Sequence, residues 1–227
     1  MSDSDPFETD PSDRAGVRPT DWLRNRAEPA WHDAVEHRFV RELGDGTLED
    51  AVFRRYLEQD YAFVETLVGA FGHALGAAPS MAAKGRLATF LCTLTDEEND
   101  YFERSFDALG TDGDAEPTPT TRAFVDLLGR AATEGGYGET LAVLVPAEWA
   151  YETWATGIDE PYPDRFYLSE WIDLHATPEF VSVVDWLRSE LDRELAAASP
   201  RRTQRIERLF RRTVELEREF FDAAYDG

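Results

Sequence analysis

Hydrophobic residues recur every three or four positions along most of the chain. This spacing gathers them on one face of an α-helix, because residues three and four apart are neighbours there. The segment 48–77 shows the pattern well, with an apolar stripe made of Phe53, Tyr56, Leu57, Phe63, Val64, Leu67 and Phe71. No stretch alternates Val, Ile or Thr with polar residues as a strand would. The pattern therefore predicts an all-α fold.

Capping residues, glycines and prolines divide this pattern into about eight helices. Thr20 is a good N-cap for the first helix, Gly135 a C-cap for the fourth, and Pro178 suits the first turn of the seventh. The second, third and fifth expected helices cover about residues 48–77, 80–109 and 138–157. The first runs from near Thr20 through Phe39, and the fourth contains Phe124 and ends at Gly135. The sixth carries Phe166 to His175, the seventh begins at Thr177, and the last follows Pro200 and runs to about Tyr225. We expect one helical domain over residues 20–227, after a mobile acidic tail of residues 1–19.

The most informative stretch is Val145–Tyr151, where an acid interrupts an apolar run. On a helix, Glu148 shares a face with apolar residues and with the phenol of Tyr151. A buried ionised carboxylate costs several kcal/mol unless it is paired or hydrogen-bonded. Asp60 and Glu217 occupy the same kind of position in two other predicted helices. The three acids together predict a buried site for a small polar molecule.

Other interpretations of the acidic residues remain open at this point. Asp60 could be a surface acid, or could form a buried ion pair with an arginine such as Arg54 or Arg55. Glu98 also lies on an apolar face, and we interpret it as a structural acid within a buried ion pair. Cys92 lies in an apolar stretch with no histidine near it in the sequence, so it is expected to fill space in the core.

The formal net charge is −23. This balance argues against a nucleic-acid partner, which would need a basic surface. Lys84 is the only lysine, and every other basic residue apart from the histidines is arginine. Many acidic residues with almost no lysine are typical of halophilic proteins, because concentrated salt screens the repulsion between like charges. We therefore expect the charge to reflect the solvent rather than the substrate.

Several common metal and cofactor motifs are absent from the sequence. The histidines form no Glu-x-x-His or His-Glu-x-x-His pattern, so no metal is expected. The single cysteine excludes an internal disulfide and a multi-cysteine zinc site. Glycine-rich phosphate-binding loops and a Gly-x-Ser-x-Gly motif are missing, so no cofactor is expected either.

The apolar runs are shorter than the roughly 20 residues that span a bilayer. The N-terminus lacks the basic and apolar parts of a signal peptide, so we expect a cytoplasmic protein without membrane contact.

A set of short motifs, in order along the chain, matches a known family. The matching pieces are Trp31, His37–Val40, Gly44–Leu48, Tyr56–Tyr61, Pro146–Tyr151, Trp171–Ile172 and Leu216–Tyr225. Tyr-Leu-x-Gln-Asp-Tyr and Leu-Glu-x-x-Phe-x-Asp-x-Ala-Tyr are fairly specific when both occur in this order. On these residues the chain resembles the TenA (thiaminase II-like) family over about residues 30–226. The resemblance implies the single-domain, all-α haem-oxygenase-like fold.

The resemblance also implies an activity, since known members hydrolyse aminopyrimidines of thiamin salvage. They release ammonia from an aminomethyl-pyrimidine, and the formylaminomethyl derivative is a second possible substrate here; the product is the hydroxymethylpyrimidine. By resemblance, Asp60 would hold the pyrimidine amino group and ring nitrogen, and Glu217 would be the acid/base for the leaving amine. Tyr151 would hydrogen-bond near the reacting centre, and Phe63 and Phe220 would stack on the ring. No cofactor is implied, and members are commonly homotetramers.

One departure from the family pattern affects the expected chemistry. Ala147 stands where members with a nucleophilic cysteine carry that cysteine. The chain looks like the branch that lacks it and uses a glutamate, for which Glu148 is the candidate. Water would then attack, with Glu148 or Glu217 as general base. Phe124 and His175 also stand at positions where tyrosine is common in the family. The lost hydroxyl groups change the polar groups that the substrate meets. The remaining residues expected to bind substrate are Phe124, Trp171 and His175.

Two other functions stay open on the sequence alone. A non-catalytic pyrimidine-binding or regulatory protein would keep the same pocket without turnover. A haem-oxygenase-like oxidase would use a metal, which a metal assay of the pure protein would reveal.

Overall fold

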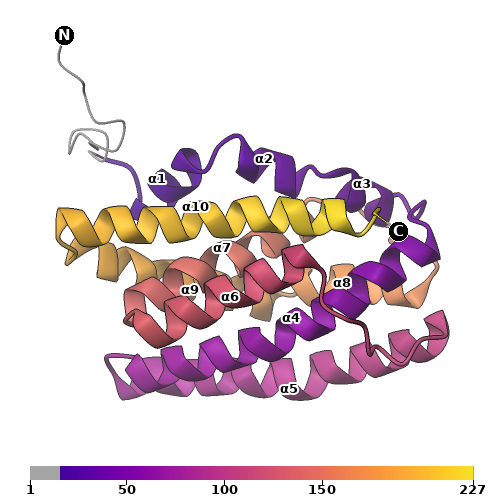
Figure 1. Cartoon of the computed structure of the whole chain (residues 1–227), viewed down its shortest axis with the longest axis horizontal. Helices are drawn as coiled ribbons and strands as arrows, with labels where there is room; N and C mark the ends of the chain where they lie inside the picture. Colours follow the sequence, from indigo (N-terminus) through magenta and orange to yellow (C-terminus); the bar gives the residue numbers. More distant parts are fainter. Residues whose placement is uncertain (1–15, 227) are drawn as a thin grey trace, which may run out of the picture.

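The computed structural model describes residues 16–226, and these contain ten α-helices and no strand (Figure 1). The helices are α1 Pro19–Arg26, α2 Ala30–Val35, α3 Arg38–Gly44, α4 Asp50–Ala77, α5 Met81–Leu109, α6 Pro119–Glu134, α7 Tyr137–Ala155, α8 Phe166–Ala176, α9 Pro178–Ala196 and α10 Pro200–Ala223. The all-α prediction is confirmed. Every helix after residue 48 begins and ends within a few residues of its expected position.

The prediction of one N-terminal helix over residues 20–39 is wrong, because the chain forms α1, α2 and α3 there. Pro29 lies between the first two helices; proline lacks an N–H group and disfavours helical backbone in the residue before it. His37 begins α3, since its ring nitrogen Nδ1 accepts a hydrogen bond from the Phe39 amide at 3.1 Å. The three short helices pack against the bundle rather than extending it (Figure 1).

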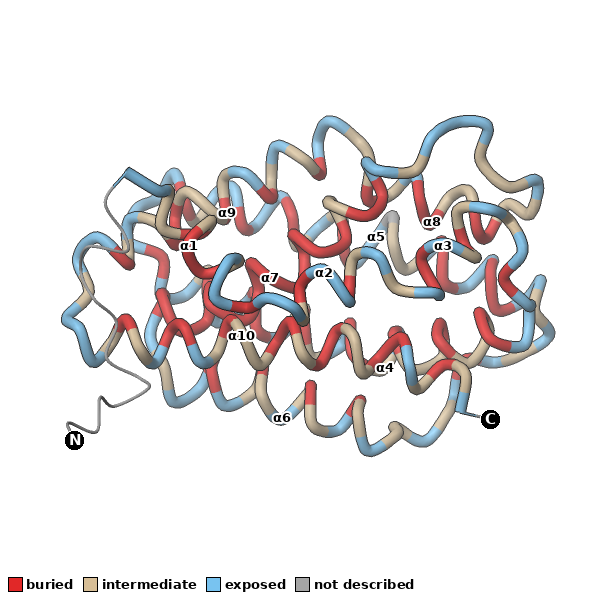
Figure 2. The backbone as a smooth tube through the Cα atoms, turned by 90° about the horizontal axis from the view of Figure 1, so that it is seen from above, coloured by how far each residue is buried: buried red, intermediate tan, exposed pale blue. Residues whose placement is uncertain are grey.

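Helix α7 lies at the centre of the molecule, and its backbone is buried along almost its whole length (Figure 2). Only Glu152 and Thr153 of this helix are half-buried, and every other residue is buried. A helix that is apolar on all sides has to be covered on all sides. It packs against α2, α4, α6, α8, α9 and α10. The bundle around α7 therefore carries Glu148 into the interior.

Polar caps and one glycine explain why the helix ends could be predicted. Ser80 begins α5 by accepting a hydrogen bond from the Ala83 amide at 3.1 Å. Hydroxyl side chains of the preceding residue begin α6, α9 and α10 in the same way. Helix α6 ends at Gly135, where a Cβ atom would lie 2.4 Å from the carbonyl oxygen of Ala131. A larger residue would force the backbone to shift there.

Residues 1–15, most of the stretch expected to be a mobile tail, lie outside the described residues. At the end of that stretch, Arg18 forms ion pairs with Asp185 and Asp192 of α9, at 2.9 and 2.6 Å. Among residues 16–226, no helix has the length and apolar character needed to cross a membrane.

Candidate active site

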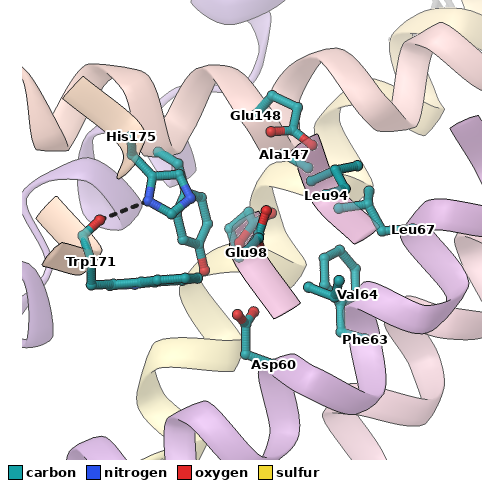
Figure 3. Close-up of a pocket in the computed structure, with 12 residues that line it drawn as sticks. Asp60, Phe63, Val64, Leu67, Leu94, Glu98, Ala147, Glu148, Trp171 and His175 are labelled. Carbon is teal, nitrogen blue, oxygen red and sulfur yellow. Dashed lines mark hydrogen bonds between the residues drawn. The ribbon is translucent and has the colours of Figure 1, made fainter. Parts of the chain in front are cut away.

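A narrow cavity lies between α4, α5, α7, α8 and α10, and Figure 3 shows the side chains around it. Its lining consists of Asp60, Phe63, Val64, Leu67, Leu94, Glu98, Ala147, Glu148, Tyr151, Trp171, His175 and Glu217. The free volume is about 30 Å³, which holds roughly two waters. A pyrimidine ring would therefore have to displace lining side chains as it binds. The structure brings the three acids singled out in the sequence, from three helices, to this one cavity.

The cavity gathers four carboxyl groups, and three of them are almost fully enclosed. Asp60, Glu148 and Glu217 are 3%, 6% and 2% exposed, whereas Glu98 is half-buried. Burial raises the pKa of all four carboxyl groups, and for Glu98 the value reaches about 8. The neighbouring carboxylates add to the rise for the three enclosed acids. Such acids can hold a proton near neutral pH, which suits proton transfer to or from a substrate.

No described arginine or lysine neutralises these acids. One oxygen each of Asp60, Glu148 and Glu217 is buried without a hydrogen-bond partner among the described residues. The ion pair considered for Asp60 is absent, because Arg54 lies 3.9 Å from Glu58 and Arg55 donates to the carbonyl of Ala224. Buried polar atoms in proteins are normally hydrogen-bonded. Unsatisfied oxygens facing one cavity therefore point to a ligand that carries N–H donors or a positive charge.

Glu98 was expected to form a structural ion pair, and that prediction is wrong for the described residues. Glu98 lines the cavity with Asp60 and Glu148, and no described cation lies within ion-pair distance of it. Its position on the apolar face of α5 was visible in the sequence, but the absence of a partner was not. Glu98 therefore joins the three enclosed acids as a candidate residue of the site.

A second group that sequence reasoning left out of the site is Tyr56. Its hydroxyl hydrogen-bonds the Tyr151 hydroxyl at 2.6 Å, and both side chains are buried. Burial raises the pKa of both phenols, and the nearby Asp60 carboxylate raises each further. Tyr56 does not line the cavity itself. Its link to the site is the hydrogen bond to the hydroxyl of Tyr151, which lines the cavity.

His175 is neutral in this environment. Its Nδ1 lies 2.8 Å from the carbonyl oxygen of Trp171 (Figure 3). A carbonyl can only accept, so Nδ1 carries the hydrogen and donates it. Burial lowers the pKa of the imidazole to about 4, which leaves Nε2 as an acceptor at neutral pH. His175 therefore adds no positive charge to the carboxyl groups around it.

The aromatic residues expected to bind the ring are only partly placed on the cavity. Phe63 and Trp171 line it, whereas Phe124 and Phe220 do not. Both lie behind Phe63, with ring centroids 4.5 and 6.2 Å from its own. The expected pair of stacking faces, Phe63 and Phe220, is therefore not formed across the cavity in this structure, because the two rings contact each other instead.

The position where a nucleophilic cysteine would stand does face the cavity, and Ala147 occupies it. Cys92 does not replace that group. It is exposed on α5, so its expected role as core filler is wrong. Apolar residues flank Cys92 in the sequence, but its own side chain lies on the solvent-facing side of α5. Within residues 16–226, no group of three or more His, Cys, Asp or Glu side chains is arranged to hold a metal ion.

A family model described as the TENA/THI-4/PQQC family matches residues 24–227. The chain belongs to this family. Among members of the family, an aminopyrimidine aminohydrolase of Halalkalibacterium halodurans is 29% identical over 211 residues. That match covers 90% of this chain and 94% of the relative. The family resemblance seen in the short motifs is thereby confirmed.

Solved structures agree with this family and its fold. A TenA homologue from P. horikoshii OT3 has a TM-score of 0.82 and 25% identity, over 92% of this chain and 99% of that one. A domain of unknown function with a heme oxygenase-like fold, from Shewanella denitrificans OS217, has a TM-score of 0.64 and 13% identity. It covers 93% of this chain and 94% of its own. The predicted haem-oxygenase-like fold is confirmed.

Proposed function

We propose that this family member is an aminopyrimidine aminohydrolase of thiamin salvage. It would hydrolyse the exocyclic C–N bond of an aminomethyl- or formylaminomethyl-pyrimidine and release the hydroxymethylpyrimidine. The observation that carries the proposal is the set of three enclosed carboxyl groups with unsatisfied oxygens, which surround one cavity with an aromatic wall. An aminopyrimidine offers both the N–H donors that these oxygens lack and a flat ring for that wall.

The roles of the residues are those that the family resemblance implies, and their positions around the cavity support them. Asp60 binds the pyrimidine amino group and ring nitrogen, and Glu217 handles the leaving amine. Tyr151, oriented by its hydrogen bond to Tyr56, lies between these acids and His175. Ala147 offers no thiolate for a covalent adduct, so water attacks and a carboxylate accepts its proton. Cleavage of thiamin itself is not expected for the same reason.

Three broader expectations belong to the same proposal. The net charge of −23 with a single lysine suits a protein of concentrated salt. Its location is the cytoplasm. Its assembly is a homotetramer, in keeping with the family, and gel filtration in high salt would measure it.

The test is formation of the hydroxymethylpyrimidine in about 2–3 M KCl, where surface charges are strongly screened. Hydrolysis of 4-amino-5-aminomethyl-2-methylpyrimidine would release ammonia with it, and hydrolysis of the formylamino derivative would release formamide. The wild-type protein should release ammonia, and Glu217→Gln should lose roughly 100-fold or more in kcat, as expected for a lost general acid or base. The substitution Glu219→Gln, two residues along α10, is the matched control and should keep full activity, because Glu219 pairs with Arg212 at 3.0 Å and does not line the cavity.

Other outcomes favour other functions. Wild-type protein that binds the pyrimidine without turnover would favour a binding or regulatory role. A stoichiometric metal in the purified protein, needed for an oxidase activity, would favour the haem-oxygenase-like oxidase.

A further inference from the structure

Glu98 differs from the other cavity acids in its access to solvent. Asp60, Glu148 and Glu217 are at most 6% exposed, whereas Glu98 is half-buried at the edge of the cavity on α5. Figure 3 shows its carboxylate between those of Asp60 and Glu148. Glu98 is therefore the one acid of the four around the cavity whose residue is partly exposed to solvent.

A groove on the protein surface lies directly beside this acid. Its volume is about 410 Å³, and it is lined by Tyr61, Val64, Glu65, Val68, Leu94, Thr95 and Asn99 of α4 and α5. Val64 and Leu94 line both the groove and the cavity. The two spaces thus share a thin wall of apolar side chains. Glu98 follows Leu94 by one helical turn and lies at the end of that wall.

Two nearby acids of α5 have partners among the described residues, and Glu98 does not. Asp100 lies 2.9 Å from Arg104, and Glu103 accepts a hydrogen bond from Asn99 at 3.1 Å. No ion pair or hydrogen bond to a described residue engages the Glu98 side chain. The Glu98 carboxyl lines the cavity, and its neighbours Thr95 and Asn99 on α5 line the groove. A proton on Glu98 therefore has a short route to the groove.

We propose that Glu98 is the catalytic base that takes a proton from the attacking water and returns it to solvent through the groove between α4 and α5. The inference rests on the proposed aminohydrolase function. It explains how a site with three enclosed acids resets its protonation after each turnover.

The proton balance of the step is complete without a further reactant. The substrate enters with its aminomethyl group as an ammonium ion, next to the carboxylate of Glu217. The C–N bond breaks and its electron pair leaves with nitrogen, so the amine departs as neutral ammonia. The water oxygen forms the new C–O bond and loses one proton to Glu98. Glu98 then releases that proton to solvent, and the enzyme returns to its starting state.

The surroundings of Glu98 give this base a pH dependence. The titratable groups that face it are Asp60 on α4, Glu148 and Tyr151 on α7, His175 on α8, Glu217 on α10 and Tyr101 on its own helix. None of them is a cation at neutral pH, and burial places the pKa of Glu98 at about 8. A base must be deprotonated to act, so kcat/KM should rise as pH increases through this region.

The test compares Glu98→Gln with Glu103→Gln, a solvent-exposed glutamate further along the same helix. We expect Glu98→Gln to lose roughly 100-fold or more in kcat, with KM changed only a few-fold, while Glu103→Gln matches wild type. The rise of kcat/KM near pH 8 should be absent in the residual activity of Glu98→Gln. In Glu98→Ala, added formate should restore part of the rate, because a small carboxylate can enter from the groove.

Each contrary result has a distinct meaning. Full kcat in Glu98→Gln, beside an active wild type, would overturn the role of Glu98 and leave the aminohydrolase function standing. Loss of pyrimidine binding together with activity, with no formate rescue in Glu98→Ala, would show a structural role and also overturn it. A wild type that forms no hydroxymethylpyrimidine from either pyrimidine would overturn both proposals.

Discussion

Helix α7 carries two buried glutamates in opposite surroundings. Glu139, at its N-terminal end, and Glu148, in the cavity, are both 6% exposed. The Glu139 carboxylate accepts hydrogen bonds from Arg202 at 3.0 and 3.1 Å and from the Gly136 amide at 3.2 Å. Burial alone would raise the pKa of Glu139, but Arg202 outweighs it and the pKa is lowered. Glu148 has no such partner, and its pKa is raised.

The two buried glutamates of α7 therefore show that burial alone does not make an acid functional. A buried carboxylate with an arginine and a backbone donor contributes to the fold, because its charge is compensated. A buried carboxylate without them costs stability, and a natural protein keeps such a group where a ligand or a reaction needs it. The comparison makes predictions in which the two glutamates should behave in opposite ways.

The largest expected effect is on activity. Glu148→Gln should lower the rate of ammonia release by roughly 100-fold or more, because the substitution removes a carboxyl group that faces the substrate and the attacking water. Glu139→Gln should leave the rate near that of wild type. Steady-state ammonia release from both variants measures the difference. Equal losses in the two variants would contradict the comparison.

A smaller and reversed effect is expected for stability. Glu139→Gln should lower the free energy of unfolding by about 1–2 kcal/mol, since Arg202 is partly exposed and solvent screens part of the ion pair. Glu148→Gln should not lower it, because the carboxyl group that it removes is uncompensated. Urea unfolding at high salt provides the measurement.

The lowered pKa of Glu139 means that its contribution to the free energy of unfolding exists at neutral pH and is lost in acid. The unfolding curves of Glu139→Gln and the wild-type protein should therefore converge as the pH falls below about 4.

The pH dependence of stability sharpens the comparison further. Glu98 has a raised pKa in the folded state, so the native protein holds a proton that the unfolded chain releases above about pH 4.3. Wild-type stability relative to Glu98→Gln should therefore fall as the pH rises from that value to about 8, and then level off. Melting temperatures of both proteins across this range would show it. A constant difference would mean that burial does not hold a proton on this acid.

The smallest effect concerns the pair of phenols. Tyr56→Phe removes the partner of the Tyr151 hydroxyl and should cost about 0.5–1.5 kcal/mol of unfolding free energy. It should also reduce kcat a few-fold, since Tyr151 would lose its fixed orientation. Tyr167→Phe is the control. Its hydroxyl donates a hydrogen bond to Asp50 at 2.8 Å, and neither residue lines the cavity. A drop in stability without any change in kcat would limit Tyr56 to a packing role.

The sequence could predict most of the helices and the three enclosed acids, because both depend on local spacing. An acid inside an apolar stripe, such as Asp60 or Glu217, is visible without knowledge of the neighbouring helices. What the spacing could not show is which groups meet across helices. The missing partner of Glu98 and the placement of Phe220 behind Phe63 are of this kind.

Local breaks and exposed faces account for the remaining errors. The prediction of a single N-terminal helix was wrong at Pro29. The effect of this proline on the backbone outweighed the apolar spacing on both sides. Cys92 lies among apolar residues in the sequence, but its own side chain points away from the core. Its neighbours' burial therefore said little about it.

The burial of α7 on every side constrains how this scaffold can diverge. Ala147, Glu148 and Tyr151 belong at once to the cavity wall and to the packed centre that holds six other helices together. A substitution that reshapes the cavity from α7 therefore also disturbs the core, and most such changes destabilise. Helix α5 packs only against α4 and α8 among its principal contacts. New substrate preferences can arise most freely along its cavity-facing side, where a change in one side chain leaves the rest of the bundle intact.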